Sequence, residues 1–184
     1  MYSQVSILPH HIYRATEHGA DFRELCNRLK LTPEMLSDGE AHLPYKPGED
    51  EDFWTHAVAL TGDPCLGLHM GQKSDRYNVF GMLGMLAGSC RTIGEAMDAV
   101  SRYNDTLTGV FNYKLDVSGT NGIFEMTPIA LWEESNLESA RQAVDMSIAG
   151  WITAIHEMGT RKIYPLQTEL KYKKRFEDEY RKIV

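Results

Sequence analysis

The first hundred residues carry apolar side chains at helical spacing. Phe22, Leu25, Cys26 and Leu29 follow the i, i+3, i+4, i+7 pattern of one helix face, and Asp21 precedes them as a candidate N-cap. By the same criteria we expect helices over residues 10–19, 21–29, 33–38, 49–61, 66–71, 81–88 and 92–107. The first part of the chain is therefore predicted to be helical.

Three of these helices carry additional signals. The acidic run at 49–52 suits the positive end of a helix dipole. Residues 81–88 are apolar all round, which predicts a buried helix whose glycines let another backbone approach closely. Thr92 and Glu95 form a T-x-x-E capping box, which marks the start of the next helix.

The hydrophobic period then changes from helical to alternating. Residues 110–117 alternate apolar and polar side chains and predict a half-buried strand. Residues 118–122 contain Asn-Gly and predict a hairpin turn, with a return strand over 123–127. The second half of the chain therefore begins with a β-hairpin.

Beyond the hairpin, a connector containing Trp132 leads to a long predicted helix over 136–158. Residues 166–172 alternate again and predict a third strand, and a last helix is expected from 176 onward. The fold class that follows is α+β, with N-terminal helices packed on a β-β-α-β unit that has a small antiparallel sheet. Such a sheet needs its edge covered, so we expect the natural chain to continue beyond Val184.

Length and charge narrow the function. A chain of 184 residues suits one domain, and its net charge of −7 argues against a stand-alone nucleic-acid binder. The segment from Thr160 to Val184 carries eight Lys/Arg and four Asp/Glu, a local net of +4. This basic end is either a solvated surface or a segment that approaches an anion such as DNA held by a neighbouring domain.

The cysteines and the N-terminal sequence indicate the cellular compartment of the protein. Cys26, Cys65 and Cys90 are far apart and form no CxxC pair, which favours a reduced, cytoplasmic protein. The N-terminus lacks the pattern of a signal peptide, and no apolar run approaches the length of a membrane span. We therefore expect no membrane partner.

No familiar catalytic or nucleotide-binding motif is present, so we expect no enzyme and no cofactor. His10, His11 and His18 could share a metal, but isolated surface histidines are the favoured interpretation, and we expect no metal site. His69 and His156 lie in apolar contexts typical of core or pocket residues.

The pattern leaves open an adaptable apolar pocket, since seven methionines occupy positions that are mostly core-facing. Plain core packing is the simpler interpretation of these methionines. Arg141 and Asp145, one helical turn apart, could be a polar anchor in such a pocket, although a surface ion pair is the favoured interpretation. Aromatic side chains that could line the pocket are Tyr103, Phe111, Tyr113, Phe124, Trp132 and Trp151.

Residues 61–71 and 81–103 resemble the N-terminal effector-binding, arabinose-binding-like domain of one branch of AraC-type transcriptional regulators. That branch has T-G-D-P-x-L-G-L-x-x-G, followed by G-x-L-G and later by T-(L/I)-x-E-A and R-Y. The residues that match are Thr61, Gly62, Asp63, Pro64, Leu66, Gly67, Leu68, Gly71, Gly81, Leu83, Gly84, Thr92, Glu95, Ala96, Arg102 and Tyr103. The resemblance covers nearly the whole chain, and Met85 departs from it where the family commonly has an aromatic residue.

The resemblance implies a regulatory domain that precedes a C-terminal helix-turn-helix DNA-binding domain. It implies a small-molecule effector bound between the helices and the sheet, a homodimer, and DNA contact only through the C-terminal domain. The candidate ligand-binding residues are Tyr103, Phe111, Tyr113, Trp132, Arg141 and Trp151. The alternatives are a dimerisation module without an effector and a haem or gas sensor, although the Y-x-S-x-R motif of haem–nitric-oxide sensors is absent.

Overall fold

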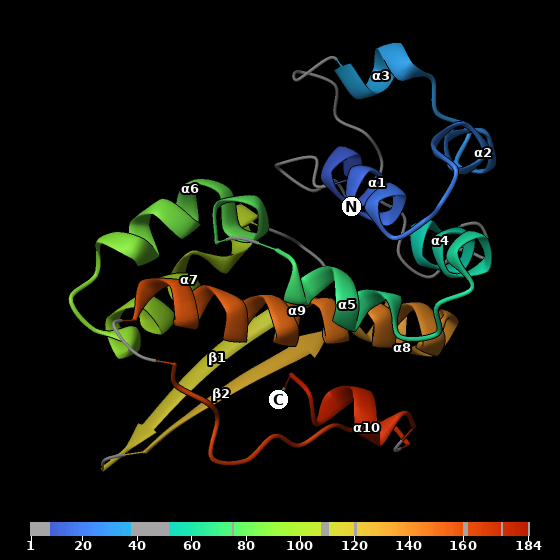
Figure 1. The fold of residues 1–184 in the computed structure, drawn as a ribbon. Helices are drawn as coiled ribbons and strands as arrows, with labels where there is room; N and C mark the ends of the chain where they lie inside the picture. Colours follow the sequence, from blue (N-terminus) through green and yellow to red (C-terminus); the bar gives the residue numbers. More distant parts are fainter. Residues whose placement is uncertain are drawn as a thin grey trace.

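The computed structural model describes residues 8–37, 52–74, 76–107, 111–119, 121–159, 162–173 and 175–183. Helices pack on a small antiparallel sheet, as the α+β prediction requires (Figure 1). The N-terminal part consists of α1 (Leu8–Glu17), α2 (Phe22–Arg28), α3 (Pro33–Ser37) and α4 (Phe53–Thr61). Within the described residues, no helix is both long enough and apolar enough to cross a membrane.

Aspartate side chains cap the starts of α2 and α4, and a glycine ends α4. The Asp21 carboxylate accepts a hydrogen bond from the backbone N–H of Glu24 at 2.8 Å, which confirms the predicted N-cap of α2. Asp52 caps α4 in the same way, accepting from the N–H of Thr55 at 2.9 Å. This helix therefore begins later than predicted, and residues 49–51 lie outside the described part of the chain. Gly62 ends it with a φ of 68°, a left-handed conformation that favours glycine.

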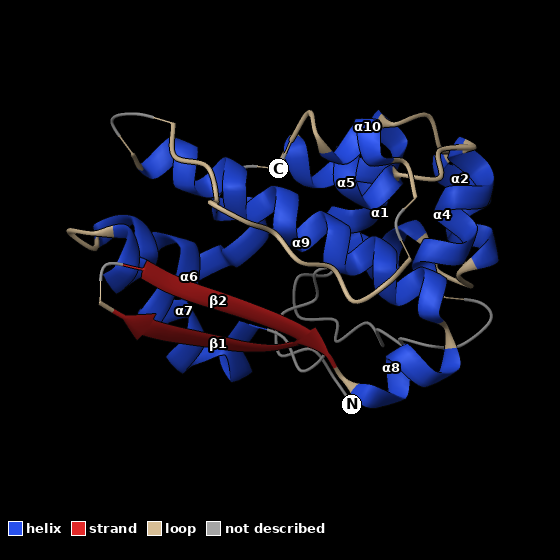
Figure 2. Cartoon of the chain, turned by 90° about the horizontal axis from the view of Figure 1, so that it is seen from below, coloured by secondary structure: helices blue, strands red, loops and turns tan. Residues whose placement is uncertain are grey.

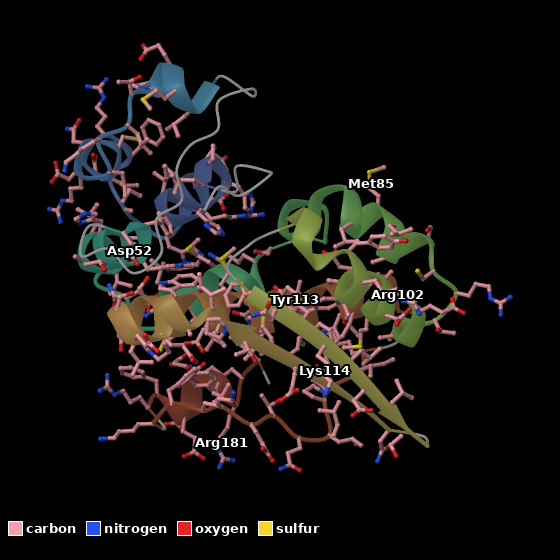
Figure 3. The ribbon with its side chains drawn as sticks, turned by 180° about the vertical axis from the view of Figure 1, so that it is seen from behind. Asp52, Met85, Arg102, Tyr113, Lys114 and Arg181 are labelled. Atoms are coloured by element: carbon pink, nitrogen blue, oxygen red, sulfur yellow. The ribbon has the colours of Figure 1, made fainter. Side chains whose placement is uncertain are left out.

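Three helices form the middle of the chain: α5 (Leu66–Gln72), α6 (Arg76–Ser89) and α7 (Ile93–Leu107). The expectation of a buried helix over 81–88 is only partly right. Leu83 and Ala87 are buried in the contact with α7 and α9, but 62% of Met85 and 43% of Leu86 are exposed. Figure 3 shows Met85 on the outer side of α6, where no described element covers it. Apolar residues on every side of this helix therefore did not mean that every side is buried.

The capping box at the start of α7 is confirmed, with one difference in its partner. The Thr92 hydroxyl accepts from the N–H of Glu95 at 3.1 Å, and the Glu95 carboxylate accepts from the N–H of Arg91 at 2.9 Å. The helix departs from helical geometry at Tyr103, with φ −106° and ψ 15°.

The sheet contains two described strands, β1 (Phe111–Ser118) and β2 (Asn121–Pro128). They pair antiparallel from Phe111 opposite Pro128 to Ser118 opposite Asn121. The hairpin is therefore confirmed, but the strands pair up to Ser118 and Asn121, so the turn lies two residues before the Asn121-Gly122 pair. Gly119 supplies the positive φ, at 63°, while Asn121 already belongs to the strand.

The predicted third strand is wrong. Residues 166–172 form no strand, and Leu166 is 93% exposed. The segment is attached to the core by side chains, notably the Tyr172 hydroxyl, rather than by a backbone ladder. Leu166, at one end of the alternating pattern, is exposed, while Tyr172, at the other end, reaches α9. A period-2 pattern alone therefore does not distinguish a strand from a segment attached by a side chain.

The remaining elements are α8 (Ala130–Ser135), α9 (Leu137–Met158) and α10 (Glu177–Tyr180). The predicted connector around Trp132 is thus a short helix. Asn136 caps α9 by accepting from the N–H of Ser139 at 3.0 Å, and the predicted long helix is confirmed. Figure 1 shows α9 running through the middle of the molecule, with α5 beside it and the hairpin below it. Figure 2, turned by 90°, shows the C-terminal segment and α10 passing along α9 on the side away from α6 and α7.

Candidate functional site

Five aromatic side chains form a continuous row between the hairpin and α8 and α9. Ring centroids are 5.6 Å apart for Phe111 and Trp132, 6.1 Å for Phe111 and Tyr113, and 5.7 Å for Tyr113 and Phe124. Phe124 then meets Trp151 at 4.7 Å. We call these five residues the aromatic row. It joins the main hydrophobic cluster, which holds Trp132, to the cluster of α6, α7 and α9, which holds Trp151.

The row is buried at its ends and half-buried in its middle. Trp132, Trp151 and Phe111 are buried, while Tyr113 and Phe124 keep partial access to solvent. Burial raises the pKa of Tyr113 to about 12, although a hydrogen bond with Ser147 lowers it. Its hydroxyl therefore stays neutral at physiological pH and can both donate and accept a hydrogen bond.

Four of the six predicted ligand-binding residues thus lie together, and the other two lie elsewhere. Tyr103 is 52% exposed at the irregular turn of α7 and is not part of the row. Arg141 belongs to a polar cluster around α9, described next. Phe124, which completes the row, was expected among the aromatic residues that could line a pocket but was not one of the six candidate ligand-binding residues.

Arg141 is buried rather than at the surface, so the interpretation of a surface ion pair with Asp145 is wrong. Its guanidinium is held by the Glu138 carboxylate and donates to the carbonyl oxygen of Pro64 at 2.8 Å. The nearest Asp145 oxygen lies 3.6 Å from Nη1. Both side chains are at most 4% exposed because α5 and the C-terminal segment cover this part of α9.

Asp145 connects the C-terminal segment to α9. Its carboxylate, 0% exposed, accepts hydrogen bonds from the hydroxyls of Tyr172 and, at 2.7 Å, Tyr180. Burial raises the pKa of Asp145 above its ordinary value, while the two tyrosines and Arg141 act in the opposite direction. Burial also raises the pKa of both tyrosines, and the adjacent carboxylate raises them further, so the hydroxyls remain donors.

A cavity of about 430 Å³ lies between the segment 165–175 and α10, next to this cluster. Tyr172 and Tyr180 form part of its wall, together with Lys173, Arg175 and Arg181. Figure 3 shows Arg181 on the C-terminal part of the molecule, well away from Tyr113 on the hairpin. The cavity and the aromatic row have no residue in common and are therefore separate places in the fold.

A second polar chain ties α4 to α8 and α9, and sequence reasoning missed it. The second carboxylate oxygen of Asp52 accepts from the Ser139 hydroxyl, whose oxygen accepts from the indole N–H of Trp132 at 3.1 Å. All three side chains are buried. The pairing fixes the orientation of the Trp132 ring at one end of the aromatic row, so Asp52 positions a candidate site residue.

His11 and His69 lie in surroundings that differ from the expected ones. His11 is buried and stacks on Phe53 with ring centroids 5.4 Å apart, contrary to the expected surface position. Burial and the neighbouring His10 lower its pKa to about 3. His69 lies between the carboxylates of Asp63, at 2.6 Å, and Glu179, at 3.4 Å, rather than in an apolar context. Among the described residues, no group of three or more histidine, cysteine or acidic side chains could hold a metal.

The turn before α5 and the glycines within α5 bring that helix against α9. A Cβ on Gly71 would lie 2.3 Å from the carbonyl oxygen of Met146, so the two backbones are in direct contact. The carbonyl of Pro64 accepts from both Arg141 and Gln142, each at 2.8 Å. A close backbone approach through glycines, predicted for residues 81–88, occurs at α5, where the T-G-D-P-x-L-G-L-x-x-G stretch holds the polar side chains of α9 in place.

The fold is therefore that of a helical domain with a small hairpin and a long central helix. The family of the arabinose-binding domain of AraC transcription regulators, N-terminal, matches residues 19–184. The chain belongs to this family of ligand-binding domains of transcription regulators. No curated protein matches the chain.

Proposed function

We propose that the chain is the small-molecule-sensing domain of a cytoplasmic AraC-type transcription regulator. In this proposal residues 1–184 form one regulatory domain, and a C-terminal helix-turn-helix domain makes the contacts with DNA. Family membership supports a ligand-sensing role. The effector itself does not follow from the family, because one fold serves many ligands.

The aromatic row is the observation that carries the proposal. The half-buried rings of Tyr113 and Phe124, held between buried aromatic neighbours, provide apolar area with fixed geometry, as ligand sites require. Tyr113 adds a neutral hydroxyl in the middle of the row. An effector that inserts beside Tyr113 and Phe124 would move the hairpin relative to α9. It would shift the population of domain arrangements only if it bound one arrangement more tightly than the other.

Tyr103 and Arg141 have different roles in this proposal. Arg141 is committed to Glu138 and Pro64, so it supports the site through the position of α9. Tyr103 is half exposed at the irregular turn of α7 and lies outside the row. We therefore place both at the edge of the site.

The test is native mass spectrometry of the purified protein, followed by tryptophan fluorescence with any co-purifying compound. The chain has three tryptophans, of which Trp132 and Trp151 belong to the row and Trp54 does not. Trp54→Phe removes the third emitter and leaves two reporters at the proposed site. A saturable fluorescence change in this variant supports the proposal, and a compound that binds without any change opposes it.

A dimerisation module without an effector is the second candidate. The exposed Met85 and Leu86 of α6 favour it, since adjacent exposed apolar side chains are typical of contact surfaces. We propose that α6 contributes to a homodimer contact in either case. Leu86→Glu should shift the protein from dimer to monomer in sedimentation velocity, whereas Leu137→Glu, at a residue 59% exposed on α9, should leave the dimer intact.

A further inference from the structure

The lining of the cavity beside α10 is positively charged, although the protein as a whole is acidic. Its wall contains three cationic side chains, Lys173, Arg175 and Arg181, and one carboxylate, Glu177. The formal charge of the wall is therefore +3 − 1 = +2, whereas the whole chain carries −7. Positive charge concentrated around a concave surface attracts small anions and repels cations.

Part of the cavity lining is apolar and exposed to solvent. Pro165, Leu166 and Leu170 are among its lining residues, and Leu166 is 93% exposed. An apolar side chain so exposed would gain from contact with the apolar part of a ligand. The volume of about 430 Å³ falls within the roughly 300–1,000 Å³ of small-molecule sites.

Two tyrosines give the cavity a fixed surface. The hydroxyls of Tyr172 and Tyr180 are bound to the buried carboxylate of Asp145, so their rings are held in place. A ligand therefore meets rings that are already ordered, which lowers the entropy lost on binding. Contact with these rings also couples the cavity to α9 through Asp145.

We propose that this cavity binds a small organic monoanion, such as a monocarboxylate with an apolar body. The carboxylate is held by Arg181 and Lys173, and the apolar body packs on Leu166, Leu170 and the tyrosine rings. Arg181 now pairs with Glu177 at 2.6 Å and is 73% exposed, so it can turn toward an incoming carboxylate without losing a buried contact. Binding restrains the C-terminal segment against α9.

The experiment is isothermal titration calorimetry of the whole chain with benzoate, hexanoate and inorganic phosphate at constant ionic strength. Benzamide and hexanamide serve as neutral analogues. We expect one of the two carboxylates to bind saturably at one site per chain, and its amide to bind at least roughly fivefold more weakly, as expected for loss of a charge-assisted hydrogen bond. Hydrogen exchange should then slow in residues 172–183.

Matched variants separate the cavity from general charge effects. Arg181→Gln and Lys173→Gln should each weaken carboxylate binding, while Arg102→Gln should not. Arg102 is a close match for Arg181, because it is 71% exposed and pairs with Asp98 at 2.8 Å in the same i, i+4 arrangement on α7 (Figure 3). Circular dichroism confirms that each variant is folded.

Three outcomes overturn the inference. The first is that neither carboxylate binds saturably at millimolar concentration. The second is that the amides bind as tightly as the acids, which leaves an apolar groove without charge recognition. The third is that Arg102→Gln weakens binding as much as Arg181→Gln. Trp54→Phe fluorescence reports on the aromatic row, so a failure here is distinguishable from a failure of the proposed effector site.

Discussion

Gly67 on α5 lies against the backbone of Gln142 on α9 so closely that a Cβ on Gly67 would stand 1.9 Å from the carbonyl oxygen of Gln142. The side chain of Gln142 returns to the same place, because its Oε1 accepts from the N–H of Gly67 at 2.7 Å. Its amide nitrogen donates to the carbonyl of Pro64. The contact between α5 and α9 therefore depends on the absence of a side chain at one position and the presence of an amide at the other.

Gly67→Ala should destabilise the domain. The added methyl group must push the two helices apart, and overpacking of this kind costs about 1–3 kcal/mol, or more when backbone cannot yield. Urea unfolding followed by circular dichroism measures the loss. Gly94→Ala is the control, since the nearest heavy atom to its Cβ would be 3.9 Å away and alanine favours helices. An equal loss in both variants would contradict the close-contact explanation.

Tyr180→Phe should loosen the C-terminal segment while the fold survives. The variant deletes one of two hydroxyl donors to the buried Asp145 carboxylate, and a partly unsatisfied buried charge costs about 1–3 kcal/mol or more. Hydrogen exchange should accelerate in 172–183 before other regions respond. Tyr164→Phe, at a residue 55% exposed, is the control and should behave like the parent protein. Unchanged exchange in Tyr180→Phe would show that Asp145 does not hold the segment.

His11 should make the domain sensitive to acid. Its folded-state pKa is lowered from 6.5 to about 3, chiefly by burial and also by the nearby His10. The unfolded chain therefore takes up a proton below pH 6.5 that the folded chain refuses until about pH 3, so stability is full above pH 6.5 and falls between these values. His11→Phe, which can keep the stacking on Phe53, should reduce this fall by a few kcal/mol relative to the parent in urea titrations at successive pH values. The same slope in both proteins would exclude His11 as its cause.

Local signals predicted much of the fold. Asp21, Thr92 and Asn136 stand at helix starts because a short polar side chain there satisfies free backbone N–H groups, and this is decided within four residues of sequence. The hairpin was equally predictable, because alternation over 111–117 demands a two-faced strand. The third strand was not predictable, since the same alternation at 166–172 occurs in a segment that Tyr172 attaches to α9 without any strand pairing.

The candidate site was predictable only in part. Phe111 and Tyr113 were found through the alternation of β1, and Trp151 through the helical spacing of α9. Trp132 was named although its short helix was predicted to be a connector.

The burial of Arg141 and Asp145 was not predictable, because it depends on coverage by α5 and by Tyr180, which lie about 35 or more residues away in sequence. An i, i+4 ion pair has the same sequence pattern at the surface and in the interior.

The central claim, that this domain senses an effector at the aromatic row, is tested most directly by a thermal-shift screen of metabolites on the parent protein and on Trp151→Phe. A compound at a hundredfold excess over its Kd contributes about 2.7 kcal/mol, which corresponds to a rise in Tm of about 5–10 °C for a domain of this size. We predict such a compound for the parent and a clearly smaller rise for Trp151→Phe, while Arg102→Gln behaves like the parent. A dimeric protein whose Tm no compound moves, or a rise that Trp151→Phe leaves intact, would contradict the claim.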